Sequence, residues 1–241
     1  MFCLYRDSGN FLNLCIWVHW EGGTMNIKEL QNTQINKALA YTLGLIYPLY
    51  KEKKLNGREY ILGCVNHNAG KVTQDELNKH FRDVYKMFKE CMGSSAPEIK
   101  TNKTAEYTIS PKEGFTVLVE KAGVSEIECI KILTHKVQEI AKSSIEIKKE
   151  FVKGCFDGRA SWDTTAHYLS IDVDRVYERQ DLVIEIIESL GIVINNNRRD
   201  INHKKNDQIR IKPDSLDYFM SNIGLYSACR TNIVEKAMRL L

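Results

Sequence analysis

A run of basic residues is the part of this sequence with the clearest chemistry. Between Asn195 and Lys212, six lysines and arginines stand against two aspartates, a net charge of +4, which exceeds the formal charge of +3 of the whole chain. The basic residues of the run are Arg198, Arg199, Lys204, Lys205, Arg210 and Lys212. Such a run suits an anionic partner if the fold places it beside other basic strands, and otherwise it is a solvated hairpin.

Other groupings offer weaker chemistry. Asn66-His67-Asn68 follows a predicted strand, as a nuclease His-Asn site would, but a polar loop is the alternative. The sequence has no Ser-His-Asp grouping, no phosphate-binding loop and no dinucleotide glycine pattern. Seven cysteines without CxxC spacing predict reduced thiols in a cytoplasmic compartment, with neither a disulfide framework nor a zinc site.

Two predicted helices with a central glycine are the elements that must position the functional residues. In the predicted helix 145–158, apolar residues recur at helical spacing around Gly154. A glycine inside a helix costs about 1 kcal/mol relative to alanine, so its presence predicts that another backbone comes very close. The apolar helix 39–50 carries Gly44 in the same place, and its Tyr41, Tyr47 and Tyr50 predict packing and interface residues rather than stacking platforms.

The predicted elements repeat in their order. A helix with Thr33 as its N-cap and Pro48 beyond its end opens a series of helix, hairpin, helix, hairpin and closing helix. Ser125 begins the closing helix, which extends to about residue 141. The same order then repeats, with hairpin strands near 161–163, 167–173, 192–202 and 208–212, a helix near 179–190, a helix capped by Asp214 and a last helix near 229–241.

With this order, the chain resembles a single-chain LAGLIDADG homing endonuclease over about residues 33–223. The matching residues are Leu43-Gly-Leu-Ile-Tyr-Pro-Leu-Tyr50 and Val152-Lys-Gly-Cys-Phe-Asp-Gly-Arg-Ala160. The resemblance implies an α+β fold of two pseudo-symmetric αββαββα lobes, residues 25–143 and 144–241. The paired motif helices would touch at Gly44 and Gly154, and two four-stranded sheets would form a saddle on double-stranded DNA.

The resemblance also implies where DNA would bind. It places the basic run on the saddle, so that its six lysines and arginines contact phosphates and base edges in the major groove. His167, beside Tyr168 and two threonines, is either a strand residue that faces the DNA or an ordinary surface residue.

Cleavage is where the sequence departs from the family. Each motif helix should supply a carboxylate that holds a divalent metal, expected to be Mg²⁺, against the scissile phosphate. The family's metal-binding acid is the eighth letter of the motif. In alignment with the two glycines, this position is Leu49 in the first copy and Arg159 in the second, and neither side chain can bind magnesium.

Three nearby carboxylates could take over the role. Asp157 matches the sixth letter of the motif, Asp163 lies just past the turn, and Glu52 lies just past the first motif. We predict that Asp157 and Asp163 are catalytic and that Asp157 binds the metal. The alternatives are that Asp157 is a helix C-terminal residue that hydrogen-bonds the turn and that Asp163 caps the start of a strand.

Three functions follow as hypotheses. The first is a monomeric, magnesium-dependent endonuclease that cuts double-stranded DNA at a specific site. The second keeps the saddle only for binding, as an intron RNA maturase or a DNA-binding regulator, and Leu49 and Arg159 favour it. The third is an α+β interaction module whose repeat is coincidental. No partner in a membrane is expected, because no run approaches the roughly 18 apolar residues of a membrane span.

The first 24 residues differ from the rest. They hold two of the three tryptophans and show no clean hydrophobic period. Codons for Glu21-Gly22-Gly23 can spell a ribosome-binding sequence just ahead of Met25. We therefore predict that translation begins at Met25 and that residues 1–24 are a non-native or disordered leader, which the mass of the intact native protein would test.

Overall fold

The computed structural model describes residues 26–55, 57–66, 114–163, 168–197 and 206–239, with short strand and helix pieces before residue 25 and between residues 75 and 84. Several predictions fall outside the described residues. These are the loop after Asn66, the strand expected near 99–109, and the roles of His167, Arg198, Arg199, Lys204 and Lys205.

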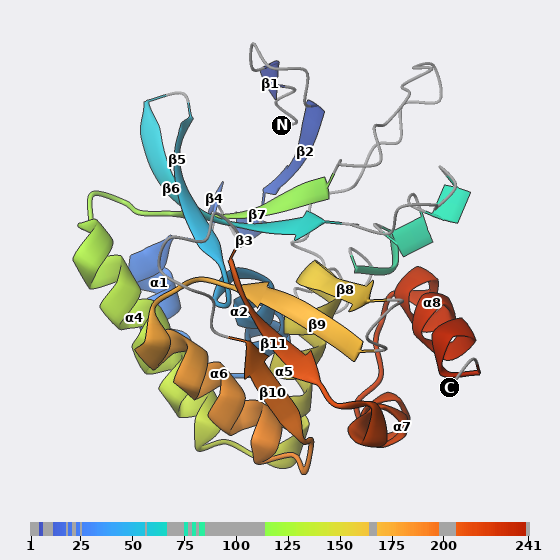
Figure 1. Ribbon diagram of the computed structural model, residues 1–241. Helices are drawn as coiled ribbons and strands as arrows, with labels where there is room; N and C mark the ends of the chain where they lie inside the picture. The colour runs from blue at the N-terminus through green and yellow to red at the C-terminus, as the bar shows by residue number, and fades with distance from the viewer. Residues whose placement is uncertain are drawn as a thin grey trace.

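Two sheets form the β part of the fold (Figure 1). The first sheet has the order β1-β2-β7-β6-β5, in which β2 is parallel to β7 and the other neighbours are antiparallel. Its strands are β1 (Tyr5–Arg6), β2 (Leu12–Trp17), β5 (Tyr50–Leu55), β6 (Arg58–Asn66) and β7 (Gly114–Glu120). The second sheet, β10-β11-β9-β8, is antiparallel throughout. Its strands are β8 (Ala160–Asp163), β9 (Tyr168–Val173), β10 (Ile194–Asn197) and β11 (Asp207–Ile211). A short antiparallel pair, β3 (His19–Trp20) and β4 (Gly23–Thr24), forms a sheet of its own next to β7.

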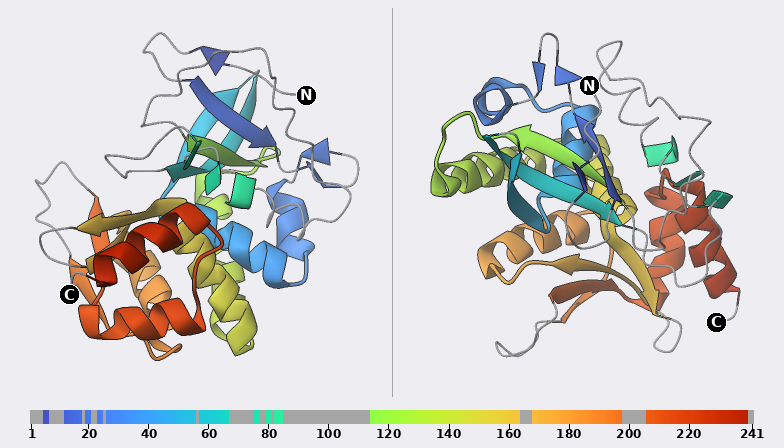
Figure 2. Two further views of the ribbon diagram at one scale, coloured as in Figure 1. Left: turned by 90° about the vertical axis from the view of Figure 1, so that its right-hand side faces the viewer. Right: turned by 90° about the horizontal axis from the view of Figure 1, so that it is seen from above.

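Helices α2 and α5 pack side by side at the centre, next to both sheets (Figure 1). Helix α4 lies along α6, and α7 and α8 lie together at one end of the second sheet (Figure 2). The described helices are α1 (Ile27–Asn32), α2 (Lys37–Ile46), α4 (Glu126–Ala141), α5 (Ile145–Arg159), α6 (Tyr177–Glu188), α7 (Pro213–Asn222) and α8 (Ala228–Met238). A hydrophobic core joins the two central helices with both sheets, and the α+β class is confirmed. None of the described helices has the length and apolar character to cross a membrane.

The prediction that Thr33 begins the first motif helix is wrong. Thr33 ends a separate short helix, α1, which a capping box opens: Asn26 Oδ1 accepts from Glu29 N at 3.0 Å, and the Glu29 carboxylate accepts from Asn26 N at 3.2 Å. The N-cap of α2 is Asn36, whose Oδ1 accepts from Leu39 N at 2.9 Å. Asn26 and Asn36, ten residues apart, are therefore the N-caps of two separate helices. The sequence pattern predicted a polar segment followed by a single helix.

Helix α7 also starts before its predicted cap. Its N-cap is Lys212 and its first residue is Pro213, so Asp214 lies inside the first turn. Proline suits this position because its missing N–H would have no partner within the helix. The start of α4 is as predicted, since Ser125 is its N-cap and its hydroxyl accepts from Glu128 N at 3.3 Å.

Candidate nucleic-acid interface

The contact between α2 and α5 is made at the two glycines. A Cβ atom on Gly44 would lie 2.1 Å from the carbonyl oxygen of Phe151, and one on Gly154 would lie 2.1 Å from that of Tyr41. Each helix thus places a backbone carbonyl directly over the glycine of the other. The structure brings Gly44 and Gly154 together, at a separation that no larger residue permits.

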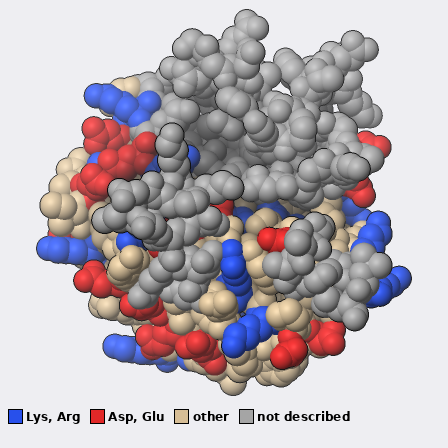
Figure 3. Space-filling model, viewed as in Figure 1, with Lys and Arg blue, Asp and Glu red and all other residues tan. Residues whose placement is uncertain are grey.

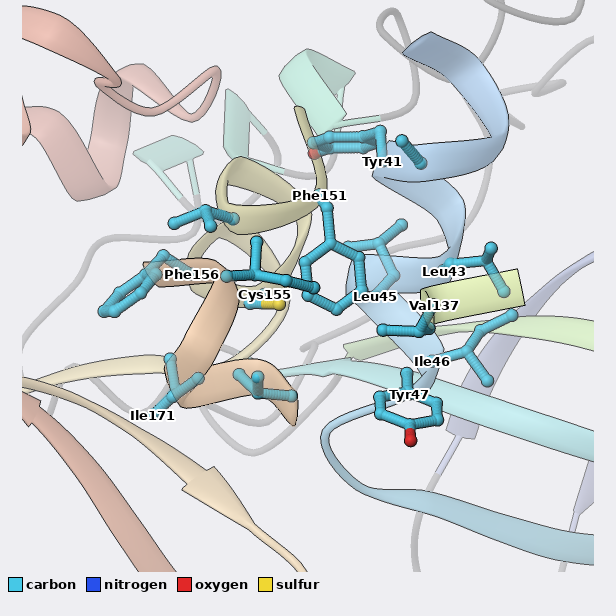
Figure 4. Close-up of a cluster of buried hydrophobic side chains, with 14 of the residues drawn as sticks. Tyr41, Leu43, Leu45, Ile46, Tyr47, Val137, Phe151, Cys155, Phe156 and Ile171 are labelled. Atoms are coloured by element: carbon cyan, nitrogen blue, oxygen red, sulfur yellow. The ribbon is translucent and has the colours of Figure 1, made fainter. Parts of the chain in front are cut away.

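Apolar side chains surround this contact. Figure 4 shows Leu45, Phe151 and Cys155 grouped between the two helices, and all three are completely buried. Burial raises the pKa of the Cys155 thiol far above its ordinary value, so the thiol stays protonated and serves as a packing group.

A hydrogen bond from the side chain of Arg159 to the backbone of Leu49 links the two positions where the family would place its acids. Arg159, only 7% exposed, donates from Nη2 to the carbonyl oxygen of Leu49 at 2.5 Å. Next to it, the carbonyl of Pro48 accepts from the backbone N–H of Asp174 at 2.9 Å. The end of the first motif is therefore tied to the end of α5 and to the residue that follows β9.

Asp157 is completely buried, and its hydrogen-bond partners lie on α2 and in the segment before α8. Its Oδ2 accepts from the Tyr41 hydroxyl at 3.0 Å and from Tyr226 N at 3.0 Å, and its Oδ1 accepts from Ser227 N at 3.1 Å. Burial raises the pKa of Asp157 to about 6, although these hydrogen bonds and Arg230 act in the opposite direction. Asp157 therefore has a hydrogen-bonding role, but it holds the segment before α8 and not the turn after α5 that the alternative named.

A second arginine caps the other motif helix. Arg230, on α8, donates to the carbonyl oxygen of Ala160, which is the C-cap of α5 and the first residue of β8. Burial lowers the pKa of Arg230 to about 10, which leaves it charged at neutral pH. A guanidinium therefore stands beyond each motif helix, where the helix dipole favours a positive charge. No local pattern in the sequence points to Arg230, because 70 residues separate it from its acceptor.

The residues at the motif ends do not fit a magnesium ion. Magnesium requires carboxylate or other oxygen donors in a near-octahedral arrangement, whereas these positions offer a guanidinium and a leucine. Asp163 is the last residue of β8, paired with Tyr168 in the sheet register, and Glu52 accepts from Lys121 Nζ at 2.8 Å. The described part of the chain contains no group of three or more His, Cys, Asp or Glu side chains that could hold a metal.

Both sheets carry basic side chains that are exposed or partly exposed. The β5–β6 hairpin projects away from the helices (Figure 1) and exposes Lys51, Lys54 and Arg58. On the second sheet, Arg210 is partly buried and Lys212 is exposed. Figure 3 shows basic side chains interspersed with acidic ones over the described part of one face, so the charge there is mixed.

The Arg159 link has a measurable contribution to stability. We expect Arg159→Met to lower the free energy of unfolding by about 2 kcal/mol, because a buried, charge-assisted hydrogen bond between the motif ends is lost. Urea denaturation measures the change. The matched control is Arg58→Met, whose 3.4 Å pair with Glu120 is exposed and should contribute under about 0.5 kcal/mol. Equal effects of the two substitutions would contradict the assigned role of Arg159.

Comparison with known proteins gives matches among solved structures. No family model matches the chain, and no curated protein matches it in sequence. The structure of I-DmoI in complex with DNA and Mn matches at 16% identity and a TM-score of 0.47, over 79% of this chain and 98% of that one. The complex of I-DmoI with DNA and Ca matches at 14% and 0.48, over 88% and 99%.

A third match is the N-terminal LAGLIDADG domain of DUF199/WhiA, at 14% identity and a TM-score of 0.46, over 82% of this chain and 89% of that one. These matches are thus to the homing endonuclease I-DmoI and to a LAGLIDADG domain.

Proposed function

We propose that this chain binds double-stranded DNA with a LAGLIDADG-like saddle and does not cut it by metal-assisted chemistry at the motif ends. The observation that supports this proposal is the hydrogen bond from Arg159 to the carbonyl oxygen of Leu49. It joins the two positions at which the nuclease mechanism needs carboxylates, and a guanidinium there repels a divalent cation. The hydrogen bond therefore supports the binding hypothesis over the endonuclease hypothesis.

The order of strands supports a two-lobed saddle. After α2, the chain forms β5, β6 and β7 as neighbours in one sheet, and after α5 it forms β8, β9 and β11 as neighbours in the other. Beyond β11 lies β10, and beyond β7 lies β2, which comes from residues that precede the first lobe. We assign residues 25–143 and 144–241 to the two lobes. Because one chain supplies both sheets, it acts as a monomer.

Charge supports a nucleic-acid partner. The exposed Lys51, Lys54 and Arg58 belong to the first sheet, and Arg210 and Lys212 lie on and just after the last strand of the second, so both sheets carry cations. Lysine and arginine side chains of this kind bind phosphates, which supply most of the affinity for DNA.

Mobility shifts across a salt series test the binding. We expect the affinity for duplex DNA to fall steeply as salt increases, because each phosphate contact releases condensed counterions. A flat dependence on salt would reject DNA binding and leave the interaction module. Duplex and single-stranded RNA, tested in parallel, separate the regulator from the maturase.

Incubation with Mg²⁺ and genomic DNA tests the absence of cutting. We expect the DNA to remain intact over a range of protein concentrations. Discrete fragments would overturn this part of the proposal. In that case, Asp157→Asn and Asp163→Asn would show which of the two predicted carboxylates the reaction uses.

A further inference from the structure

An aromatic and charged cluster joins two corners of the chain beside the motif helices. The guanidinium of Arg179, in the first turn of α6, lies 4.2 Å from the centroid of the Tyr50 ring and 5.4 Å from that of the Tyr47 ring. Arg179 also donates from Nη1 to Oδ2 of Asp174. We call Tyr47, Tyr50, Asp174 and Arg179 the corner cluster.

The corner cluster joins segments that belong to different sheets. Tyr47 is the C-cap of α2 and Tyr50 is the first residue of β5, so these two rings flank the passage from the first motif helix into the first sheet. Asp174 follows β9 and Arg179 lies on α6, so they flank the passage from the second sheet into the helix after it. The cluster therefore connects the first sheet to the second through side chains.

Arg179 is held in place from the side of the second sheet. It is only 5% exposed. Its neighbour Gln180 donates from Nε2 to the carbonyl oxygen of Asp174 at 2.6 Å and to Oδ2 of Asp207, the first residue of β11, at 2.8 Å. These hydrogen bonds fix the start of α6 against the second sheet, and the two tyrosine rings reach the guanidinium from the first half of the chain.

The corner cluster restricts a motion that the glycine contact alone would permit. Gly44 and Gly154 let α2 and α5 touch along one line, and packed helices can slide or roll along such a line. The cluster attaches the end of α2 to α6 rather than to α5. A roll of α2 would therefore draw the Tyr50 ring away from the guanidinium of Arg179. A cation that is largely removed from water loses a substantial attraction when its aromatic partner moves away.

We propose that Arg179 is a positioning residue that fixes the two sheets relative to each other, so that the chain binds DNA only when the two stretches of duplex that they contact have one fixed spacing. Arg179 acts through the rings of Tyr47 and Tyr50, and it does not touch the DNA. The inference rests on the DNA binding proposed above, and it adds which residues set the spacing.

Duplex geometry makes the spacing a sensitive measure of how the sheets are held. One inserted base pair moves one stretch of B-DNA by about 3.4 Å along the axis and turns it by about 34° relative to the other stretch. Two sheets that are rigidly joined cannot follow both changes, so one of them loses contacts. Two sheets that can roll recover part of these contacts.

The test uses the full chain and the duplex that it selects from a random DNA library. One base pair is inserted at the centre of that duplex, and mobility shifts give the affinity for the original and the lengthened duplex. For the wild type, we expect the insertion to weaken binding by roughly 50-fold, within the cost of a lost base contact. Arg179→Met should reduce this penalty by roughly 10-fold, within what a cation–π contact contributes when it is removed from water.

Two substitutions of Tyr50 keep the test decisive if Arg179→Met, which leaves the carboxylate of Asp174 without its cation, fails to fold. Tyr50→Leu removes the aromatic face below the guanidinium, so it should reduce the penalty as Arg179→Met does. Tyr50→Phe keeps this face and should restore the wild-type penalty.

The matched control is Arg175→Met. Arg175 lies in the same corner of the chain, and its Nε is 4.0 Å from Oδ1 of Asp207, so this pair joins two segments of the second half. The substitution should leave the penalty unchanged. A general loss of stability lowers the folded fraction and weakens binding to both duplexes alike, so the ratio of the two affinities responds only to how the sheets are held.

The outcomes separate the two proposals. If the wild-type chain binds duplexes without any dependence on salt, DNA binding itself fails. If binding depends on salt but the chain enriches no site, or binds the lengthened duplex as well as the original, the fixed spacing fails and DNA binding stands. If the wild type shows the penalty and both Arg179→Met and Tyr50→Leu keep it in full, the corner cluster does not set the spacing.

Discussion

Replacing Gly154 by alanine is expected to destabilise the protein by about 3 kcal/mol or more, the upper end of what overpacking in a core costs. The new methyl group would lie 2.1 Å from the carbonyl oxygen of Tyr41. Because the contact is with backbone, no side-chain rotation can relieve it and α2 must move away from α5. Gly44→Ala should have a similar effect, since its methyl group would meet the carbonyl of Phe151 at the same distance. Urea denaturation measures both changes.

Gly158→Ala is the matched control on the same helix. Its methyl group would meet the flexible end of Leu45, Cδ2, at 3.2 Å, and the backbone of Leu45 no closer than 3.7 Å. Alanine also gains about 1 kcal/mol of helix propensity over glycine. We therefore expect a change within about 1 kcal/mol. Indistinguishable stabilities of the Gly154→Ala and Gly158→Ala proteins would show that the two motif helices do not touch as described.

The carboxyl group of Asp157 is expected to make stability depend on pH between about 4 and 6. Burial raises its pKa from the ordinary 3.8 to about 6 in the folded protein. Between these values the folded state binds more protons than the unfolded state, so stability is greatest at the acidic end of this range and falls as the pH rises. One pKa unit corresponds to about 1.4 kcal/mol, so the contribution of this carboxyl group is about 3 kcal/mol.

Comparison with Asp157→Asn isolates this contribution from those of the other carboxylates. We expect the free energy of unfolding of the wild type, minus that of the variant, to decrease by about 2 kcal/mol from pH 4 to pH 6.5. Urea denaturation at several pH values gives this difference. A difference that stays constant, or that increases with pH, would mean that the hydrogen bonds from Tyr41, Tyr226 and Ser227 outweigh burial.

Gly154 and Asp157 bear on the function in different ways. Gly154 serves the packing that any protein with paired motif helices needs, whether it cuts DNA or only binds it. Asp157 was the strongest candidate for a metal ligand in the sequence, and its three hydrogen bonds leave it as the anchor of the segment before α8. Its role as a metal ligand stays a prediction that this geometry does not favour.

Local patterns in the sequence predicted the bounds of a helix or strand well where neighbouring residues alone determine them. The Ser125 cap, the α5 helix and the strand β9 all lie within a residue or two of their predicted bounds. The pattern failed where two signals overlap within a few residues. Asn26 and Asn36 each open a helix, and the sequence alone did not show that Thr33 lies between two helices rather than at the start of one.

From the sequence alone, the contact between the two motif helices could be predicted, because a glycine in an apolar helix has a cost that only close packing explains. The roles of the charged residues depend on the tertiary structure. Arg159 and Leu49 are 110 residues apart, and Asp157 and Tyr41 are 116 apart. Hydrogen bonds over such separations depend on how whole helices pack, so no local pattern encodes them.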